Sequence, residues 1–143
     1  MIVMNFVKHT KDKKKILFVC VENAGRSQIA EAFFRKYAPN GYEPVSAGTK
    51  PTLEVNPIAV SAMKEIGIDL CKQKPKVLTN EIITKSILSV NMGCVDKTEC
   101  PVVFMKNSLD WDIEDPKGKS IDKVREIRDN IELKVRKLCK TLE

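Results

Sequence analysis

Residues 16–28 of the chain, ILFVCVENAGRSQ, decide how the fold is built. The four apolar residues 16–19 are typical of a buried strand, and they end at Cys20. Arg26 and Ser27 follow after five intervening residues, and apolar residues at helical spacing begin immediately after them. The stretch therefore predicts a strand, a tight loop and the first turn of a helix in direct succession.

Such a junction directs backbone N–H groups and the positive end of a helix dipole at one small volume, which suits a tetrahedral oxyanion. A cysteine at the start of the loop lies in the same field, so we expect Cys20 to be held as a thiolate. Arg26 offers a planar fork that matches two oxygens of phosphate or arsenate, and Ser27 can donate to the thiolate. The alternative is a buried strand-end cysteine beside a surface arginine, and the Cys-x5-Arg-Ser spacing favours the functional interpretation.

Length and composition predict one domain without a membrane or nucleic-acid partner. A chain of 143 residues with 43% hydrophobic content has room for one substantial core, so we expect a basic, flexible leader over residues 1–14 and a single domain over residues 15–143. The net charge of +6 is partly concentrated in the lysine-rich residues 8–15, which lack the interleaved aromatic residues of a nucleic-acid arm. No apolar run approaches the ~20 residues of a membrane span. Five cysteines, an odd number, indicate a reducing compartment, so we expect a cytoplasmic protein that uses thiols for chemistry.

Strand-like and helix-like segments alternate along the chain, which predicts an α/β fold with a parallel sheet between helices. The expected strands after the first are residues 42–47, 87–90 and 109–113, and the expected helices are residues 29–38, 57–66, 80–84 and a long one from Ser120. In the second helix Asn56 is the expected N-cap, and Ala59, Val60, Met63 and Ile66 are expected to face inward. Ligands in such folds bind at the carboxyl ends of strands, and Cys20 lies at one of these ends.

Cys94 and Cys100 lie in a polar loop directly after the third expected strand, at the same rim as Cys20. They could form a redox pair if the loop bends, because a disulfide needs Cα atoms within about 7 Å. Half of a zinc site is a poor match to this spacing, whereas two unrelated loop thiols fit the pair itself equally well. A reactive Cys20 on the same rim favours the redox interpretation.

Asp115, followed by Pro116, comes just after the fourth expected strand. A carboxyl group there can reach over the oxyanion loop and protonate a departing oxygen, although an ordinary Asp-Pro turn is the common alternative.

Together with the segments 46–49 (SAGT), 55–57 (VNP) and 111–119 (WDIEDPKGK), these motifs resemble an arsenate reductase of the low-molecular-weight tyrosine-phosphatase superfamily, over about residues 15–142. The resemblance implies a three-layer sandwich with a four-stranded parallel sheet. It implies that Cys20 is the nucleophile, that Ser27 stabilises its thiolate and that Asp115 is the general acid. The oxyanion would be held by Arg26 and the loop residues Val21, Glu22, Asn23, Ala24 and Gly25, with Asn23 shaping the loop.

Three departures from the phosphatases favour a reductase. Gln28 stands where phosphatases usually have proline, Lys117 stands where tyrosine phosphatases usually carry an aromatic residue, and Cys94 and Cys100 fit the place of the reductases' shuttling thiols. The implied chemistry is a Cys20/Cys94/Cys100 disulfide relay that reduces arsenate to arsenite. It needs no bound cofactor but requires an external dithiol donor, thioredoxin or a relative, and we expect a monomer. A phosphomonoester phosphatase that uses Cys20, Arg26 and Asp115, and a noncatalytic oxyanion or redox sensor, are the alternatives.

Other residues depart from the family pattern. Five residues separate Cys94 from Cys100, where well-known thioredoxin-coupled members have six, and Gly25 replaces a second loop cysteine of many relatives. Asn23, Glu31 and Ser46 match part of a monovalent-cation site, but Lys76 stands near an expected acidic ligand, so we predict no metal. Cys71 and Cys139 are expected to be packing residues.

Overall fold

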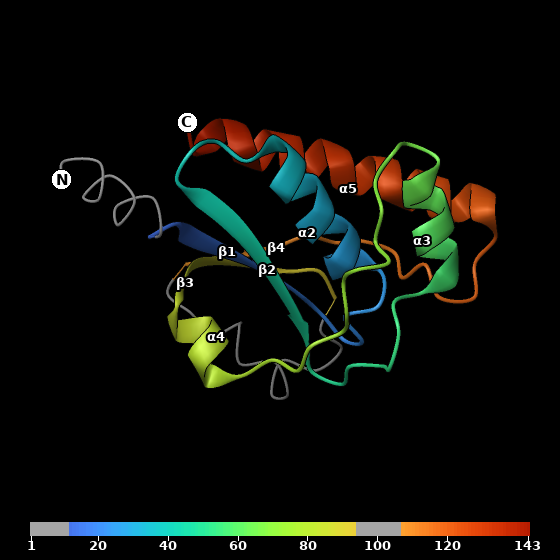
Figure 1. Cartoon of the computed structure of the whole chain (residues 1–143), viewed down its shortest axis with the longest axis horizontal. Coiled ribbons are helices and arrows are strands. Elements are labelled where there is room, and N and C mark those ends of the chain that lie inside the picture. Colours follow the sequence, from blue (N-terminus) through green and yellow to red (C-terminus); the bar gives the residue numbers. More distant parts are fainter. Residues whose placement is uncertain (1–11, 94–106) are drawn as a thin grey trace, which may run out of the picture.

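The centre of the molecule is a four-stranded, all-parallel sheet with the strand order β2-β1-β3-β4 (Figure 1). The computed structural model describes residues 12–93 and 107–143. The strands are β1 (Lys14–Cys20), β2 (Tyr42–Gly48), β3 (Ser86–Asn91) and β4 (Ser108–Asp110). All four predicted strands are confirmed, but β4 is shorter than predicted. It ends at Asp110 because its partner β3 ends at Asn91, the residue that pairs with Asp110, and Ile113 lies beyond the strand.

Helices cover both faces of the sheet, as predicted. On one face α2 (Arg26–Tyr37), α3 (Pro57–Lys64) and α5 (Ile121–Thr141) share a core with the alternate strand residues Ile16, Phe18 and Cys20. On the other face Leu17 and Val19 pack against α4 (Asn80–Thr84) through Ile83. Each residue of β1 from Ile16 onward is buried, which explains why the sequence there is continuously apolar.

The helix ends follow the sequence signals with one exception. Asn56 caps α3 by accepting a hydrogen bond from the Ile58 N–H at 2.9 Å, and Ser120 caps α5 in the same way. The prediction that Ile66 faces inward is wrong: α3 ends at Lys64, and Ile66 lies exposed in the turn that leads to Gly67. The apolar stripe of the last helix is confirmed, since Val124, Ile127, Ile131, Val135 and Leu138 are buried.

The strand order places Cys20 at the point where the topology reverses. β1 pairs with β2 on one side and with β3 on the other. The connection from β1 to β2 therefore leads to one side of β1, and the later connection to β3 leads to its other side. In parallel sheets the carboxyl end of such a strand opens onto a crevice between diverging loops, where ligands bind. No helix in residues 12–93 or 107–143 is both long and apolar enough to cross a membrane.

Candidate active site at the carboxyl ends of the strands

Cys20 and Ser27 meet at the junction of β1 and α2. The sulfur of Cys20 lies 2.9 Å from the hydroxyl oxygen of Ser27, and both residues are buried. The Asn23 amide donates a hydrogen bond of 2.7 Å to the same hydroxyl oxygen, which leaves the Ser27 proton available for the sulfur. This geometry allows the Ser27 hydroxyl to donate a hydrogen bond to the sulfur of Cys20.

Asn23 shapes the loop in a conformation that few side chains tolerate. Its backbone is left-handed (φ 51°), which asparagine adopts more readily than other non-glycine residues. Its side-chain oxygen accepts hydrogen bonds from the Lys76 backbone N–H at 2.8 Å and from the Gln28 amide at 3.0 Å. The residue that orients Ser27 is thus itself held by two other segments of the chain.

The loop between β1 and α2, residues 21–25, is called the anion loop, and the segment after β2 holds it in place. The backbone carbonyls of Val21, Glu22 and Ala24 accept hydrogen bonds from the N–H groups of residues 50, 52 and 56, at 2.8 to 3.2 Å. Gly25 stands at the N-cap of α2 without a side-chain cap, so the first turn of the helix presents backbone donors, the usual setting for anion binding. Glu22, Ala24 and Gly25 line the cavity beside Cys20, whereas Val21 and Asn23 support the loop from behind.

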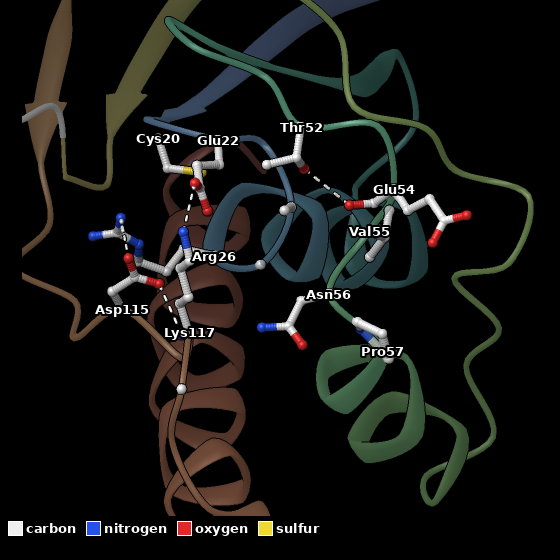
Figure 2. A pocket seen from close by; sticks show the side chains of 13 residues that line it. Cys20, Glu22, Arg26, Thr52, Glu54, Val55, Asn56, Pro57, Asp115 and Lys117 are labelled. Carbon is white, nitrogen blue, oxygen red and sulfur yellow. Dashed lines mark hydrogen bonds and ion pairs between the residues drawn. The ribbon is translucent and has the colours of Figure 1, made fainter.

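This cavity has a volume of about 390 Å³ and opens above Cys20 (Figure 2). Arg26 and Asp115 lie in its wall, and Lys117 lies at its mouth. Gly118 lines it next to Lys117. Five further lining residues come from the segment after β2 and the start of α3, and sequence reasoning did not identify them as site residues: Thr52, Glu54, Val55, Asn56 and Pro57. The VNP motif at residues 55–57 was the one signal for them.

Arg26 is nearly buried and is held by weak contacts. Its Nη1 donates to the backbone oxygen of Ile113 at 3.3 Å, and its Nη2 lies 3.6 Å from the Asp115 carboxylate. A Cβ added at Gly93 would overlap Nη1, so the backbone at Gly93 lies directly against the guanidinium. The segment of Ile113 and Asp115 and the backbone just before Cys94 therefore both contact this arginine.

Asp115 lies on a loop that rests on the anion loop. Its carboxylate accepts a hydrogen bond of 3.0 Å from the Lys117 backbone N–H and is about half exposed. Pro116 packs against Gly25 so closely that a Cβ at Gly25 would lie 2.6 Å from the proline ring. This contact gives a physical reason for glycine at a position where many relatives have cysteine.

An ion pair that the sequence did not predict spans the mouth of the cavity. Lys117 Nζ lies 3.0 Å from the Glu22 carboxylate (Figure 2). The hydrogen bond to Glu22 raises the pKa of the Lys117 ammonium, and the nearby charge of Asp115 acts in the same direction. The pair joins the loop that carries Asp115 and Lys117 to the anion loop.

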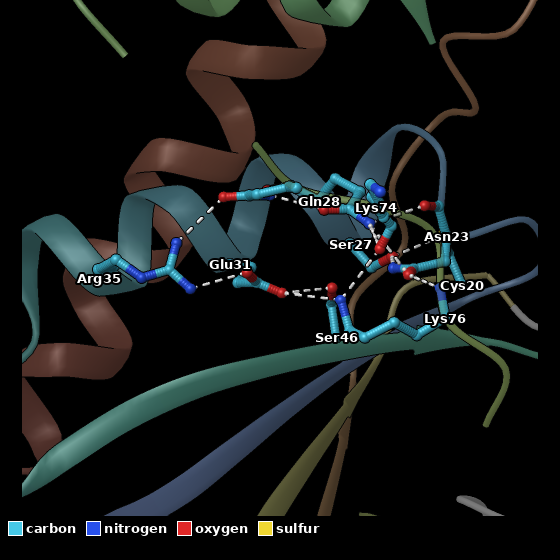
Figure 3. A network of polar contacts seen from close by, with 10 residues as sticks. Cys20, Asn23, Ser27, Gln28, Glu31, Arg35, Ser46, Lys74 and Lys76 are labelled. Carbon is cyan, nitrogen blue, oxygen red and sulfur yellow. Dashed lines mark hydrogen bonds and ion pairs between the residues drawn. The ribbon is translucent and has the colours of Figure 1, made fainter. Parts of the chain in front are cut away.

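A buried polar network supports the loop from below (Figure 3). The Gln28 amide donates to the backbone oxygens of Asn23 and Lys74, at 3.0 and 3.1 Å, and Gln73 donates to Gln28 at 2.6 Å. Gln28, identified in the sequence only as a departure from the phosphatases, thus ties the loop to the segment before α4.

Glu31, the buried carboxylate of this network, has its charge compensated by side chains of the chain itself. It accepts hydrogen bonds from Ser46 at 2.6 Å and from Arg35 at 2.8 Å, and Lys76 Nζ lies 3.7 Å away. The Lys76 ammonium thus lies beside Glu31. The family resemblance predicts an acidic cation ligand near this residue. Within the described ranges, no group of three or more His, Cys, Asp or Glu side chains could hold a metal ion.

The other cysteines divide into three groups. Cys94 and Cys100 lie outside the described residues. Cys139 is buried as predicted, and burial raises the pKa of its thiol to about 11. The prediction that Cys71 is a packing residue is wrong, because Cys71 is exposed in the turn after Leu70, where its hydrogen bond with Asp69 raises the pKa of the thiol.

Comparison with known proteins assigns a family to this architecture. Residues 15–143 match the family described as low molecular weight phosphotyrosine protein phosphatase. An arsenate reductase of Brevibacillus brevis is 37% identical over 134 residues, which are 93% of this chain and 99% of that protein.

Solved structures of both chemistries share the fold. A thioredoxin-dependent arsenate reductase of Corynebacterium glutamicum is 36% identical with a TM-score of 0.77, over 95% of this chain and 65% of that chain. An arsenate reductase in a phosphate-binding state is 28% identical with a TM-score of 0.81, over 91% and 99% of the two chains. The YwlE arginine phosphatase of Geobacillus stearothermophilus is 27% identical with a TM-score of 0.80, over 90% and 92%. The family model and the relatives agree, and the chain belongs to the low molecular weight phosphotyrosine protein phosphatase family.

Proposed function

We propose that this protein is an arsenate reductase that closes its cycle through Cys94 and Cys100 and is regenerated by a thioredoxin-like dithiol. The observation that carries the proposal is the arrangement around Arg26. Arg26 lines the Cys20 cavity, and its guanidinium lies between the Asp115 loop and the backbone of Gly93, which immediately precedes Cys94 in the chain. The similarity to arsenate reductases over almost the whole chain supports the same conclusion.

The first step forms a covalent adduct. The Cys20 thiolate attacks arsenic, the S–As bond forms, and one As–O bond breaks. The departing oxygen takes a proton from Asp115 and leaves as water. Arg26 and the backbone N–H groups of the loop hold the remaining oxygens, and the Ser27 hydroxyl, which donates to the sulfur before attack, holds the nucleophile in place.

The next two steps are thiol–disulfide chemistry. The Cys94 thiolate attacks the Cys20 sulfur, forming a disulfide while the electron pair of the S–As bond passes to arsenic, which leaves as arsenite. The Cys100 thiolate then attacks Cys94 and releases Cys20. The thioredoxin-like donor supplies two electrons and two protons to the Cys94–Cys100 disulfide. Because such donors work in reducing compartments, the proposal places the enzyme in the cytoplasm.

A phosphatase activity is the second candidate, since Cys20, Arg26 and Asp115 would serve it equally and an arginine phosphatase shares the fold. That reaction has no use for Cys94, so the Cys94→Ser variant separates the two functions. We expect multiple-turnover arsenate reduction with a thioredoxin system to fall at least a thousandfold. Slow hydrolysis of an aryl phosphate should persist at the parent rate.

The control is Cys20→Ser, which should lose both activities. Arsenate reduction at the parent rate in Cys94→Ser would contradict the relay. Absence of arsenate-dependent oxidation of the donor by the parent protein, with efficient hydrolysis of a phosphomonoester or of phosphoarginine, would replace the reductase by a phosphatase.

A further inference from the structure

The backbone of Gly93 and the guanidinium of Arg26 share a space that admits no side chain. Gly93 has φ +127°, a conformation that L side chains rarely adopt. A Cβ built there would overlap Nη1 of Arg26 and would lie 2.8 Å from Cζ. Two independent features, the backbone angle and the lack of room, thus require glycine at this position.

The two sides of this contact differ in how firmly they are held. The chain before Gly93 is anchored, because the Met92 side chain is fully buried in the core and its N–H donates to the Val19 carbonyl at 2.7 Å. The Gly93 N–H also donates to the Asn91 side chain. Arg26, in contrast, is the end of a flexible side chain whose two other contacts are long, 3.3 and 3.6 Å. A side chain at position 93 would therefore displace the guanidinium and leave the backbone in place.

We propose that Gly93 is a positioning residue for Arg26, which keeps the guanidinium fork aimed at the oxyanion above Cys20. Gly93 immediately precedes Cys94 in the chain, so Arg26 contacts the residue next to the proposed shuttling cysteine. This inference deepens the proposed function but requires only that Arg26 binds a tetrahedral oxyanion. It is therefore tested with phosphate, whose binding does not depend on reduction.

The test compares two glycines that both have a positive φ. Gly93→Ala should weaken phosphate binding by about ten- to a hundredfold, the value of charge-assisted hydrogen bonds from an arginine fork. The matched control is Gly67→Ala, at φ +82° in the turn after α3, where a Cβ meets nothing within 4 Å. Alanine is also strained at this positive φ, so Gly67→Ala should lose thermal stability as well, yet bind phosphate like the parent.

A spectroscopic signal distinguishes a displaced arginine from a damaged fold. The Nε–H resonance of Arg26, assigned by its disappearance in Arg26→Lys, should move in Gly93→Ala and stay in Gly67→Ala, while resonances of the core amides match the parent in both. Unchanged phosphate affinity in a folded Gly93→Ala would overturn the inference, as would equal losses of affinity in the two glycine variants. Failure of arsenate reduction with the phosphate results as expected would instead count against the proposed function alone.

Discussion

Arg26 and Lys117 hold opposite positions in the site, although both are cations. Arg26 is nearly buried and lies against two segments of the chain, whereas Lys117 is exposed and forms an ion pair with Glu22 at the mouth. An exposed pair contributes little to folding, so we predict that Lys117 instead shapes the field that an incoming oxyanion meets.

Lys117→Gln tests that role. We expect kcat/KM for arsenate to fall a few-fold at low ionic strength and the difference from the parent to shrink as salt is added, since at 0.1 M salt the interactions of exposed charges are largely screened beyond about 10 Å. Lys85→Gln is a matched control, because Lys85 forms an exposed ion pair with Glu81 on α4, away from the cavity. A salt-independent loss, or an equal loss in the control, would contradict the field effect.

Among the elements, α3 and α5 are joined by a charged cluster. Glu65, at the C-cap of α3, accepts hydrogen bonds from Arg125 and Arg128 of α5, and Arg128 also donates to the Ala62 carbonyl at 2.8 Å. The hydrogen bond from Arg125 is the main cause that lowers the pKa of Glu65 from 4.5 to about 2. α3, whose first residue Pro57 lines the cavity, is thus attached to α5.

The lowered pKa of Glu65 defines the pH range over which this cluster stabilises the fold. A carboxyl group whose pKa is lower in the folded state stabilises the fold above the unfolded value, and this contribution is lost as pH falls through the folded value. The stability difference between the parent and Glu65→Gln should therefore be constant above about pH 5 and should shrink between pH 4.5 and pH 2. Urea unfolding at several pH values measures it, and a difference that grows on acidification would contradict the assignment.

How far the sequence predicts the structure depends on the range of the contacts involved. Local signals succeeded: the apolar run before Cys20 is β1, and Asn56-Pro57 and Ser120 start their helices. The prediction that Ile66 faces inward failed because α3 ends at Lys64, whereas the apolar pattern in the sequence continues beyond it. Helical periodicity carries no information on where the backbone turns.

Contacts between distant segments could not be predicted. Gln28 and Gln73 are 45 positions apart, and their hydrogen bond depends on the folded position of the segment before α4. Lys76 was identified as a ligand that does not fit, whereas its backbone N–H holds Asn23 and its ammonium faces Glu31. Cys71 looks like any packing cysteine in the sequence, and its exposure follows from the course of a loop.

For the molecule as a whole, the order of disulfides is the decisive test of the cycle. One turnover without a reductant should leave a Cys94–Cys100 disulfide and a free Cys20, whereas Cys100→Ser should stop at Cys20–Cys94. Trapping of free thiols followed by peptide mapping distinguishes these products. A disulfide from Cys20 to the exposed Cys71, or a Cys100 that stays free in the parent, would show that the cycle closes by another route.

The parallel sheet gives each task in this site to a different strand end. The loop of residues 21–25 follows β1, the segment that braces it follows β2, Gly93 and then Cys94 follow β3, and the loop that carries Asp115 follows β4. The strand pairings lie outside these loops, so one loop can lengthen, shorten or change its chemistry while the sheet holds the other three in place. Hydrolytic and redox enzymes with this fold can therefore diverge through changes in a single loop. The five-residue spacing between Cys94 and Cys100 is a change of this kind, which leaves the sheet unaltered.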